Sequence, residues 1–240
     1  MSRKSENFLR LALACFALSL GISNYSTPGS FSSSLLSLPI IRDFEKYLYF
    51  VFIFLPLLPK SKIQKFLSLA LCFTLIFDTT FRFSQYSPLS NLLSPLTSIM
   101  RIVFPLYATG LLSIKNNSLL LLIACFFTFL GHGLEAIFGL GKFIDYILYV
   151  NQIIGVGAEL TENEAKIALR IIGALDILSS FLLLSRYKKI GLKFMVLWGL
   201  MTAVMRLLYY DFSMFGVSEF FLRIPHWIIP LMLLAYSDDK

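Results

Sequence analysis

His132 and Glu135 have a residue pairing and spacing that could carry chemistry. Residues three apart lie on the same face of a helix, so their side chains are expected to form a hydrogen bond. A carboxylate in that position fixes the tautomer of the imidazole and supports its charged form, which lets the pair hold or relay a proton. Asp176, in another apolar run, is the third candidate. The three residues are interpreted either as a proton-coupling or ligand-binding site, or as a buried structural hydrogen-bond network.

Basic residues inside apolar runs form a second group of candidates. They are Arg82, Arg101, Arg206 and Arg223, together with His226. In the topology given below nearly all of them lie in the outer half of the bilayer, which favours a polar pocket that opens to the outer face. The alternative is structural, because arginine side chains near a helix end reach the interface. Asp78 and Asp211 are then the neighbours that neutralise Arg82 and Arg206.

The motifs of common enzyme classes do not occur in this sequence. His132 and Glu135 resemble half of a di-iron Glu-x-x-His motif in reverse order, but His226 is the only second histidine, so no metal centre is predicted. Phosphate-binding loops and the nucleophile elbow have no match. The three cysteines stand in apolar runs without metal-binding spacing. Whether the chain is an enzyme, and which cofactor it uses, is left open, with quinone as the cofactor considered.

Composition indicates what positions these residues. The chain has 240 residues, of which 57% are hydrophobic and 15% charged, and 24 are phenylalanine. A soluble domain of this length needs more surface charge, whereas apolar runs of about twenty residues suit helices that cross a hydrocarbon core. The net charge of +7 fits cytoplasmic loops that face anionic lipid. Nucleic acid is therefore not an expected partner, and membrane lipid is.

The apolar runs predict an all-α polytopic membrane protein with about eight transmembrane helices. They cover residues 8–23, 44–59, 66–83, 96–114, 118–138, 167–184, 194–210 and 220–236. The segment 140–166 is apolar but interrupted by polar residues, and counting it as a span would place basic loops outside. It is therefore interpreted as an outer re-entrant or interfacial segment, with 143–157 as its apolar part. Both termini are expected in the cytoplasm, and the membrane to be a bacterial inner membrane.

The two halves of the sequence resemble each other in order. Leu11–Gly21 and Leu121–Gly131 share six identities in eleven positions at an offset of 110. Further matches are Ser61-Lys62, Lys65 and Arg82 with Ser185-Arg186, Lys189 and Arg206, and Arg101-Ile102 with Arg223-Ile224. An even number of spans gives each copy the same orientation, so we expect two parallel four-helix repeats, 1–115 and 116–240. The second copy alone has His132, Glu135 and Asp176.

Three short motifs of the second half resemble those of DoxX-like membrane proteins. They are Gly131-His-Gly-Leu-Glu-Ala136, Phe143-Ile-Asp-Tyr146 and Ile172-Gly-Ala-Leu-Asp-Ile177, within residues 118–236. That family is built on a four-helix membrane bundle, and one branch includes a subunit of a thiosulfate:quinone oxidoreductase. The resemblance implies that the second unit is a complete bundle with His132, Glu135 and Asp176 at its polar centre. The additional first unit departs from the family pattern.

The function expected from these observations is the binding of a quinone or lipid-like ligand in an outer-leaflet polar pocket. The arginines would receive the head group, and phenylalanine-rich walls would hold the tail. The protein is then a binding bundle or an accessory subunit of a membrane complex. A proton-coupled transporter of a small organic anion is the first alternative, and a membrane oxidoreductase subunit with a catalytic partner is the second.

Overall fold

The computed structural model describes residues 3–26, 47–81, 88–139, 143–154 and 160–238. Within these ranges all regular elements are helical and none is a strand, which confirms the predicted all-α class. The elements are α1 (Arg3–Ser26), the 3₁₀ helix η1 (Tyr49–Leu57), α4 (Lys62–Phe81), α5 (Pro88–Ala108), α6 (Ile114–Ile137), α7 (Phe143–Ile154), α8 (Glu162–Leu182), α9 (Lys188–Tyr209), α10 (Met214–Leu222) and α11 (Ile224–Asp238).

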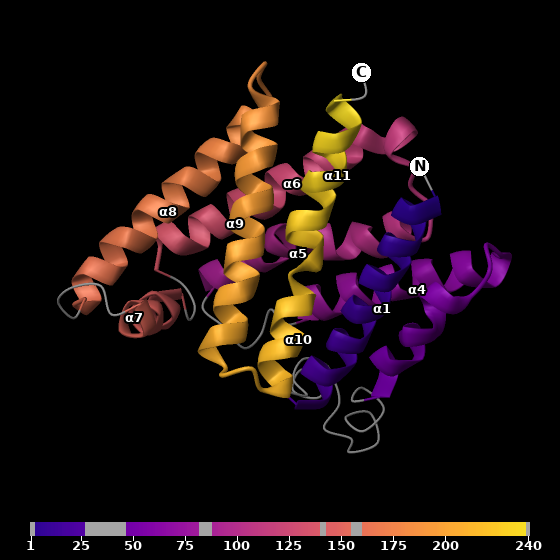
Figure 1. Cartoon of the computed structure of the whole chain (residues 1–240), viewed down its shortest axis with the longest axis horizontal. Coiled ribbons are helices and arrows are strands. Elements are labelled where there is room, and N and C mark those ends of the chain that lie inside the picture. The colour runs from indigo at the N-terminus through magenta and orange to yellow at the C-terminus, as the bar shows by residue number, and fades with distance from the viewer. Residues whose placement is uncertain (1–2, 27–46, 82–87, 140–142, 155–159, 239–240) are drawn as a thin grey trace.

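The helices pack in two layers (Figure 1). In one layer α9 packs against α10 and α11, α10 packs against α1, and α1 packs against η1. In the other layer α8 packs against α6, α6 against α5, and α5 against α4. The layers meet where α8 contacts α9, where α11 contacts both α5 and α6, and where α1 contacts α5. The short helix α7 lies outside this order and packs on α8 and α9.

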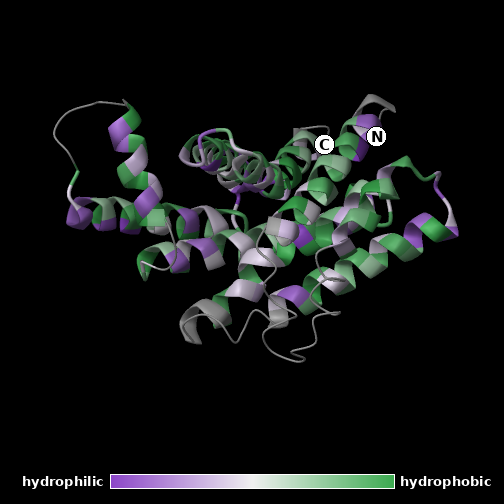
Figure 2. Cartoon of the chain, turned by 90° about the horizontal axis from the view of Figure 1, so that it is seen from below, coloured by the Kyte–Doolittle hydropathy of each residue, from purple (hydrophilic) through white to green (hydrophobic). Residues whose placement is uncertain are grey.

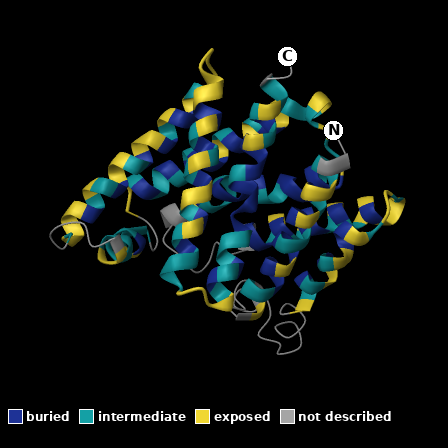
Figure 3. Cartoon of the chain, in the orientation of Figure 1, coloured by how far each residue is buried: buried dark blue, intermediate teal, exposed yellow. Residues whose placement is uncertain are grey.

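The buried side chains gather where the two layers meet (Figure 3). Phe16 of α1 and Phe104 of α5 are fully buried there, with ring centroids 5.4 Å apart in an edge-to-face arrangement. Met100, Leu121 and Ile229 bring α5, α6 and α11 into the same cluster. The core is therefore shared by the two halves of the chain.

Within the described residues, four helical stretches are long and apolar enough to cross a membrane. They are Ser5–Ser23, Ile114–Ile137, Lys188–Tyr209 and Met214–Ser237, the last of which combines α10 and α11. Hydrophobic residues run along most of the helices, and hydrophilic residues stand toward several helix ends (Figure 2). These features agree with an integral membrane protein.

The outer faces of α4 and α8 carry rows of exposed apolar side chains. On α4 the row is Ile63, Phe66, Leu69, Phe73 and Ile76, and on α8 it is Ile167, Ile171, Leu175, Leu178 and Phe181. Steps of three and four residues keep each row on one helix face. A soluble monomer rarely exposes so large an apolar patch, whereas hydrocarbon is a suitable solvent for it.

Several elements differ in detail from the expected spans, and α5 covers Pro88–Ala108 where the span 96–114 was predicted. The run predicted at 44–59 contains the 3₁₀ helix η1, which holds Pro56 and is followed by Pro59. The run predicted at 220–236 is interrupted at Arg223, which caps the C-terminus of α10 before α11 begins. Proline at 225 has no N–H to continue the hydrogen-bond ladder, so the chain turns just before it. The segment 143–154 forms the helix α7, beyond the predicted spans.

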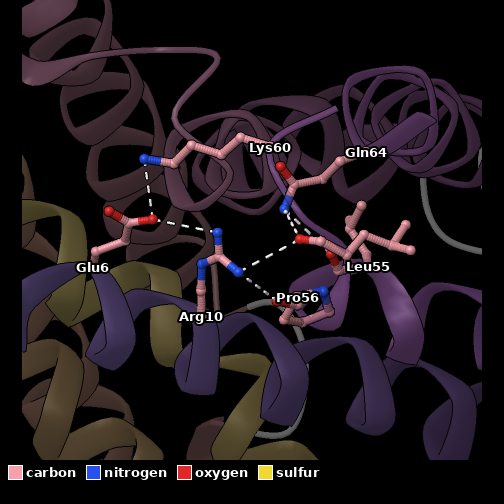
Figure 4. Close-up of polar contacts among 7 residues, drawn as sticks. Glu6, Arg10, Leu55, Pro56, Lys60 and Gln64 are labelled. Atoms are coloured by element: carbon pink, nitrogen blue, oxygen red, sulfur yellow. Dashed lines mark hydrogen bonds and ion pairs between the residues drawn. The ribbon is translucent and has the colours of Figure 1, made fainter. Parts of the chain in front are cut away.

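The end of η1 is stabilised by side chains from its neighbours (Figure 4). Gln64 Nε2 donates to the Leu55 carbonyl at 3.4 Å. Arg10 Nη1 donates to the Pro56 carbonyl at 3.2 Å. Glu6 then accepts from both Arg10 and Lys60, at 3.3 and 3.0 Å. These contacts join α1, η1 and α4.

The start of α8 shows a capping box. The Thr161 hydroxyl accepts from the backbone N–H of Glu164, and the Glu164 carboxylate accepts from the Thr161 N–H at 2.8 Å. The hydrogen bonds from the Thr161 backbone and hydroxyl hold the pKa of Glu164 below its usual value of 4.5. This cap fixes where α8 begins, and therefore where Asp176 stands along it.

Candidate ligand-binding pocket

A pocket lies among α6, α8, α9 and α11, and α7 forms part of its wall. Together with the open space at its mouth, the pocket holds about 660 Å³ of space that no protein atom fills. Most of the lining is apolar or aromatic, from Phe129, Ala136, Phe143, Tyr146, Ile147, Leu169, Ile172, Trp198 and Met205. The polar lining consists of His132, Asp176, Thr202, Arg206, Arg223 and His226.

Glycines allow the pocket helices to approach closely enough to bring these side chains together. A Cβ at Gly133 would lie 2.7 Å from the Gly173 carbonyl oxygen, and a Cβ at Gly173 would lie 2.6 Å from that of Gly133. This crossing of α6 and α8 stands one residue after His132 and three before Asp176. On α9, a Cβ at Gly199 would lie 2.8 Å from the His226 carbonyl oxygen.

His132 lies at the centre of the polar contacts. Its Nδ1 is 2.9 Å from Oε2 of Glu135, which confirms the expected pairing on one face of α6. Its Nε2 is 3.0 Å from Nη1 of Arg223 and 3.3 Å from Nε2 of His226. Arg223 and His226 are 91 and 94 residues away from His132 in the sequence. His132 therefore connects the acidic residue of α6 to the basic residues around the start of α11.

Arg206 lines the pocket from α9 and interacts with two side chains. Its guanidinium carbon lies 5.4 Å from the centre of the Tyr146 ring, a cation–π distance. Its Nε lies 3.4 Å from Oε2 of Glu219, close enough for an ion pair although not aligned as a hydrogen bond. The expected neutralisation by Asp211 was wrong, because α10 folds back on α9 and brings Glu219 to Arg206 while Asp211 stays exposed in the turn.

Several polar atoms of the lining residues are buried without a hydrogen-bond partner in the described part of the chain. They are Oδ1 of Asp176, Nη1 of Arg206, Nε of Arg223 and Nδ1 of His226. A buried donor or acceptor without a partner costs about 1–3 kcal/mol, more when it is charged. A bound molecule with matching polar atoms would remove this cost. Within the same residues no group of three or more His, Cys, Asp or Glu side chains could hold a metal ion.

The structure brings most of the sequence candidates to one place. His132, Asp176, Arg206, Arg223 and His226 line the pocket, and Glu135 contacts His132. Arg101 lies outside the lining, on α5, but close enough for its charge to act on Arg223 and His226. Arg82 lies outside the described residues.

Sequence reasoning missed several residues of the pocket. Trp198 and Tyr146 form much of its aromatic wall, and the Trp198 indole interacts with the Asp176 carboxyl. Glu219 was not among the sequence candidates, and its side chain is 21% exposed and faces Arg206. The one available signal was the short spacing between Arg206 and Glu219 across a turn that contains Asp211. The aromatic residues carried no signal, since aromatic residues are frequent throughout the chain.

No family model, curated protein or solved structure matches this chain.

Proposed function

We propose that this chain is an integral membrane protein that binds a quinone or another lipid-like molecule. The tail lies against Phe129, Phe143 and Leu169, and the head group lies at Arg206, Arg223 and His226. One observation carries the proposal: a largely apolar pocket ends at buried guanidinium and imidazole nitrogens that lack partners in the described structure. A ligand with an apolar body and an oxygen-bearing head group matches both parts.

The charge of the polar end supports an acceptor-bearing head group. Arg223 donates to the imidazole of His132, and among the described residues no carboxylate lies within ion-pair distance of it. A buried cation needs compensation, and a carbonyl or anionic oxygen of a ligand supplies it. Arg206 has Glu219 beside it, yet its Nη1 also lacks a partner.

The proposal includes a membrane topology for the chain. We infer about eight spans, since the exposed apolar rows of α4 and α8 favour contact with lipid in addition to the four long apolar helices. The termini lie in the cytoplasm, and the membrane is a bacterial inner membrane. The second unit is DoxX-like, and Gly133, Gly173 and Asp176 of the resembling motifs stand at the helix crossing beside the pocket.

An internal duplication accounts for the order of the two layers. The sequence matches pair α1 with α6, α4 with α9, and α5 with α10 and α11, which leaves η1 to pair with α8. If each helix of the layer α9, α11, α1, η1 is replaced by its partner, the order becomes α4, α5, α6, α8. This is the order in which the helices of the other layer contact one another. Helix α7 has no counterpart among the described elements, and it lies where the sequence offset changes.

A proton-coupled transporter of a small organic anion is the second candidate. The observation in its favour is Asp176, a buried carboxyl that lines the pocket and whose Oδ1 has no described partner. A carboxyl in such a place is a site where a proton can bind as a substrate enters. The pair His132 and Glu135 stands on the facing helix and would exchange charge with the same substrate.

The test is mass spectrometry of the organic extract from protein purified in mild detergent. We expect a quinone or lipid at close to one molecule per chain, and at least a tenfold lower amount in Arg206→Gln/Arg223→Gln. The magnitude follows from the loss of two charge-assisted hydrogen bonds, each worth about 1.5–3 kcal/mol. Arg186→Gln is the matched control, because Arg186 is exposed and contacts Tyr187 at a distance from the pocket.

The amounts of ligand can be compared only if every variant is folded. Thermal unfolding of each variant in the same detergent gives that check. Equal ligand in the pocket variant, the control and the unchanged protein would contradict the proposal, because the ligand would then be annular lipid. An extract without any stoichiometric small molecule would favour the transporter.

A further inference from the structure

The hydrogen bonds of the two histidines have only one consistent direction. Arginine has donors and no acceptor, so Nη1 of Arg223, 3.0 Å away, must donate to Nε2 of His132. His132 therefore carries its proton on Nδ1, where it donates to Glu135 at 2.9 Å. Glu135 is thus a positioning residue, because it selects the tautomer that accepts from Arg223.

The same contacts determine where His226 carries its proton. Its Nε2 lies 3.3 Å from Nε2 of His132, which is already an acceptor. Two facing lone pairs are unfavourable at this distance, so we assign the proton of His226 to Nε2, which then shares the acceptor with Arg223. A neutral His226 then has a lone pair on Nδ1. That atom is buried and has no partner among the described residues.

The polar end of the pocket therefore offers acceptors as well as donors. Nδ1 of His226 and Oδ1 of Asp176 are acceptors in need of a hydrogen, whereas Nη1 of Arg206 and Nε of Arg223 are donors in need of an oxygen. A head group with acceptor oxygens only, such as a quinone or a carboxylate, would satisfy the arginines and leave the acceptors unmatched. A phenolic hydroxyl both donates and accepts.

We propose that the pocket selects the quinol form of its ligand, with one hydroxyl donating to Nδ1 of His226 and its oxygens accepting from the arginines. This inference rests on the proposed function. The aromatic side chains of Tyr146 and Trp198 suit a flat ring beside this polar end. The selection concerns binding alone and involves no transfer of electrons.

The tautomers are measured first, in full-length protein labelled with ¹⁵N-histidine. The chain has only two histidines, so each resonance is assigned by removing one of them. We expect the proton of His132 on Nδ1 and that of His226 on Nε2 in protein without ligand, with a shift at Nδ1 of His226 when quinol binds. A proton on Nδ1 of His226 in the ligand-free protein overturns the inference.

Binding is then compared for a benzoquinol with one isoprenyl unit, the matching quinone and the dimethyl ether of the quinol, without oxygen. We expect the quinol to bind about tenfold more tightly than either the quinone or the ether, the usual effect of one hydrogen bond to a buried group. In His226→Gln the side-chain amide can still donate toward His132, but the ring Nδ1 is gone. The preference is therefore expected to fall to within about twofold. Met232→Leu, on α11 outside the pocket lining, is the control that should keep it.

The outcomes separate this inference from the proposed function. Equal binding of quinol and ether to the unchanged protein overturns the selection and leaves ligand binding in place. Failure of all three probes to bind overturns both. An unfolded His226→Gln, recognised by its thermal unfolding, leaves the decision to the ¹⁵N tautomers and to the comparison of the three probes in unchanged protein.

Discussion

Arg223 is unusual at the scale of single residues because its visible hydrogen-bond partner is an imidazole. Its side chain is buried, and His132 accepts from it while Glu135 orients His132 from the other side. A guanidinium held through a neutral ring keeps more of its field available than one paired directly with a carboxylate. This arrangement is suited to holding the oxygen of a ligand.

Asp176 is the residue that separates binding from proton-coupled transport. For a binding protein we expect no uptake of organic anions into vesicles that responds to an imposed pH gradient. Asp176→Asn preserves the size of the side chain and removes its ability to ionise, so it should leave the vesicles equally inactive. Radiolabelled anion uptake measures this. Uptake that follows the gradient and is abolished in Asp176→Asn would assign the pocket to the transporter.

The packing of α9 on α11 controls the pocket at the scale of secondary-structure elements. At Gly199 the backbone of α9 comes so close to the His226 carbonyl that a methyl group would overlap it. His226 and the neighbouring Arg223 belong to the helix end that this contact positions. The distance between two helices therefore determines whether the polar end of the pocket is assembled.

Gly199→Leu is expected to push α11 away from α9. Overpacking of this kind costs about 1–3 kcal/mol, so the midpoint of thermal unfolding in detergent should fall by several degrees. Retained ligand should fall as well, because Arg223 and His226 move with α11. Val204→Leu, on the exposed face of the same helix, is the control. An unchanged midpoint with unchanged ligand would show that the close contact is not needed.

The sequence predicted the elements better than the contacts between them. Long apolar runs identified α1, α6 and α9, because a span needs about twenty apolar residues whatever its neighbours are. The break at Arg223 had a signal in the proline two residues later, which the run of hydrophobic residues concealed. The hydrogen bond from Arg223 to His132 joins residues that are 91 apart in the sequence. It depends on how the helices pack, including their close approaches at glycines. That information is not present in local spacing.

The sequence identified several residues of the pocket but not how they are arranged in space. Ionisable residues in apolar runs identified His132, Asp176 and Arg206, because such residues are costly in a membrane and are kept for a reason. Their convergence on one pocket follows from the layers, which place α6, α8, α9 and α11 around a common space. The partner of Arg206 was wrongly predicted for the same reason, since a turn brought in Glu219 from α10.

At the scale of the whole molecule the proposed topology places α7 and the start of α8 on the outer side. Single cysteines at Asn151 and Glu162 are therefore expected to react with a membrane-impermeant maleimide in intact cells. Unchanged protein is the control, because Cys15 is half-buried and Cys72 and Cys125 are buried in apolar helices. Labelling of either site only after the membrane is permeabilised would contradict the topology with about eight spans.

The contact between α5 and α11 bears on why all lining residues of the pocket come from the second half of the chain. The proposed duplication relates Arg101 to Arg223, and the charge of one acts on the other. Two copies around a two-fold axis present the same residue to each other, so a homodimer of half-length chains would bring like charges together at its centre. A symmetric pair has to change both copies at once. A fused chain can add a histidine and a glutamate to one copy alone, and in the proposed duplication His132 and Glu135 align with Ile22 and Tyr25.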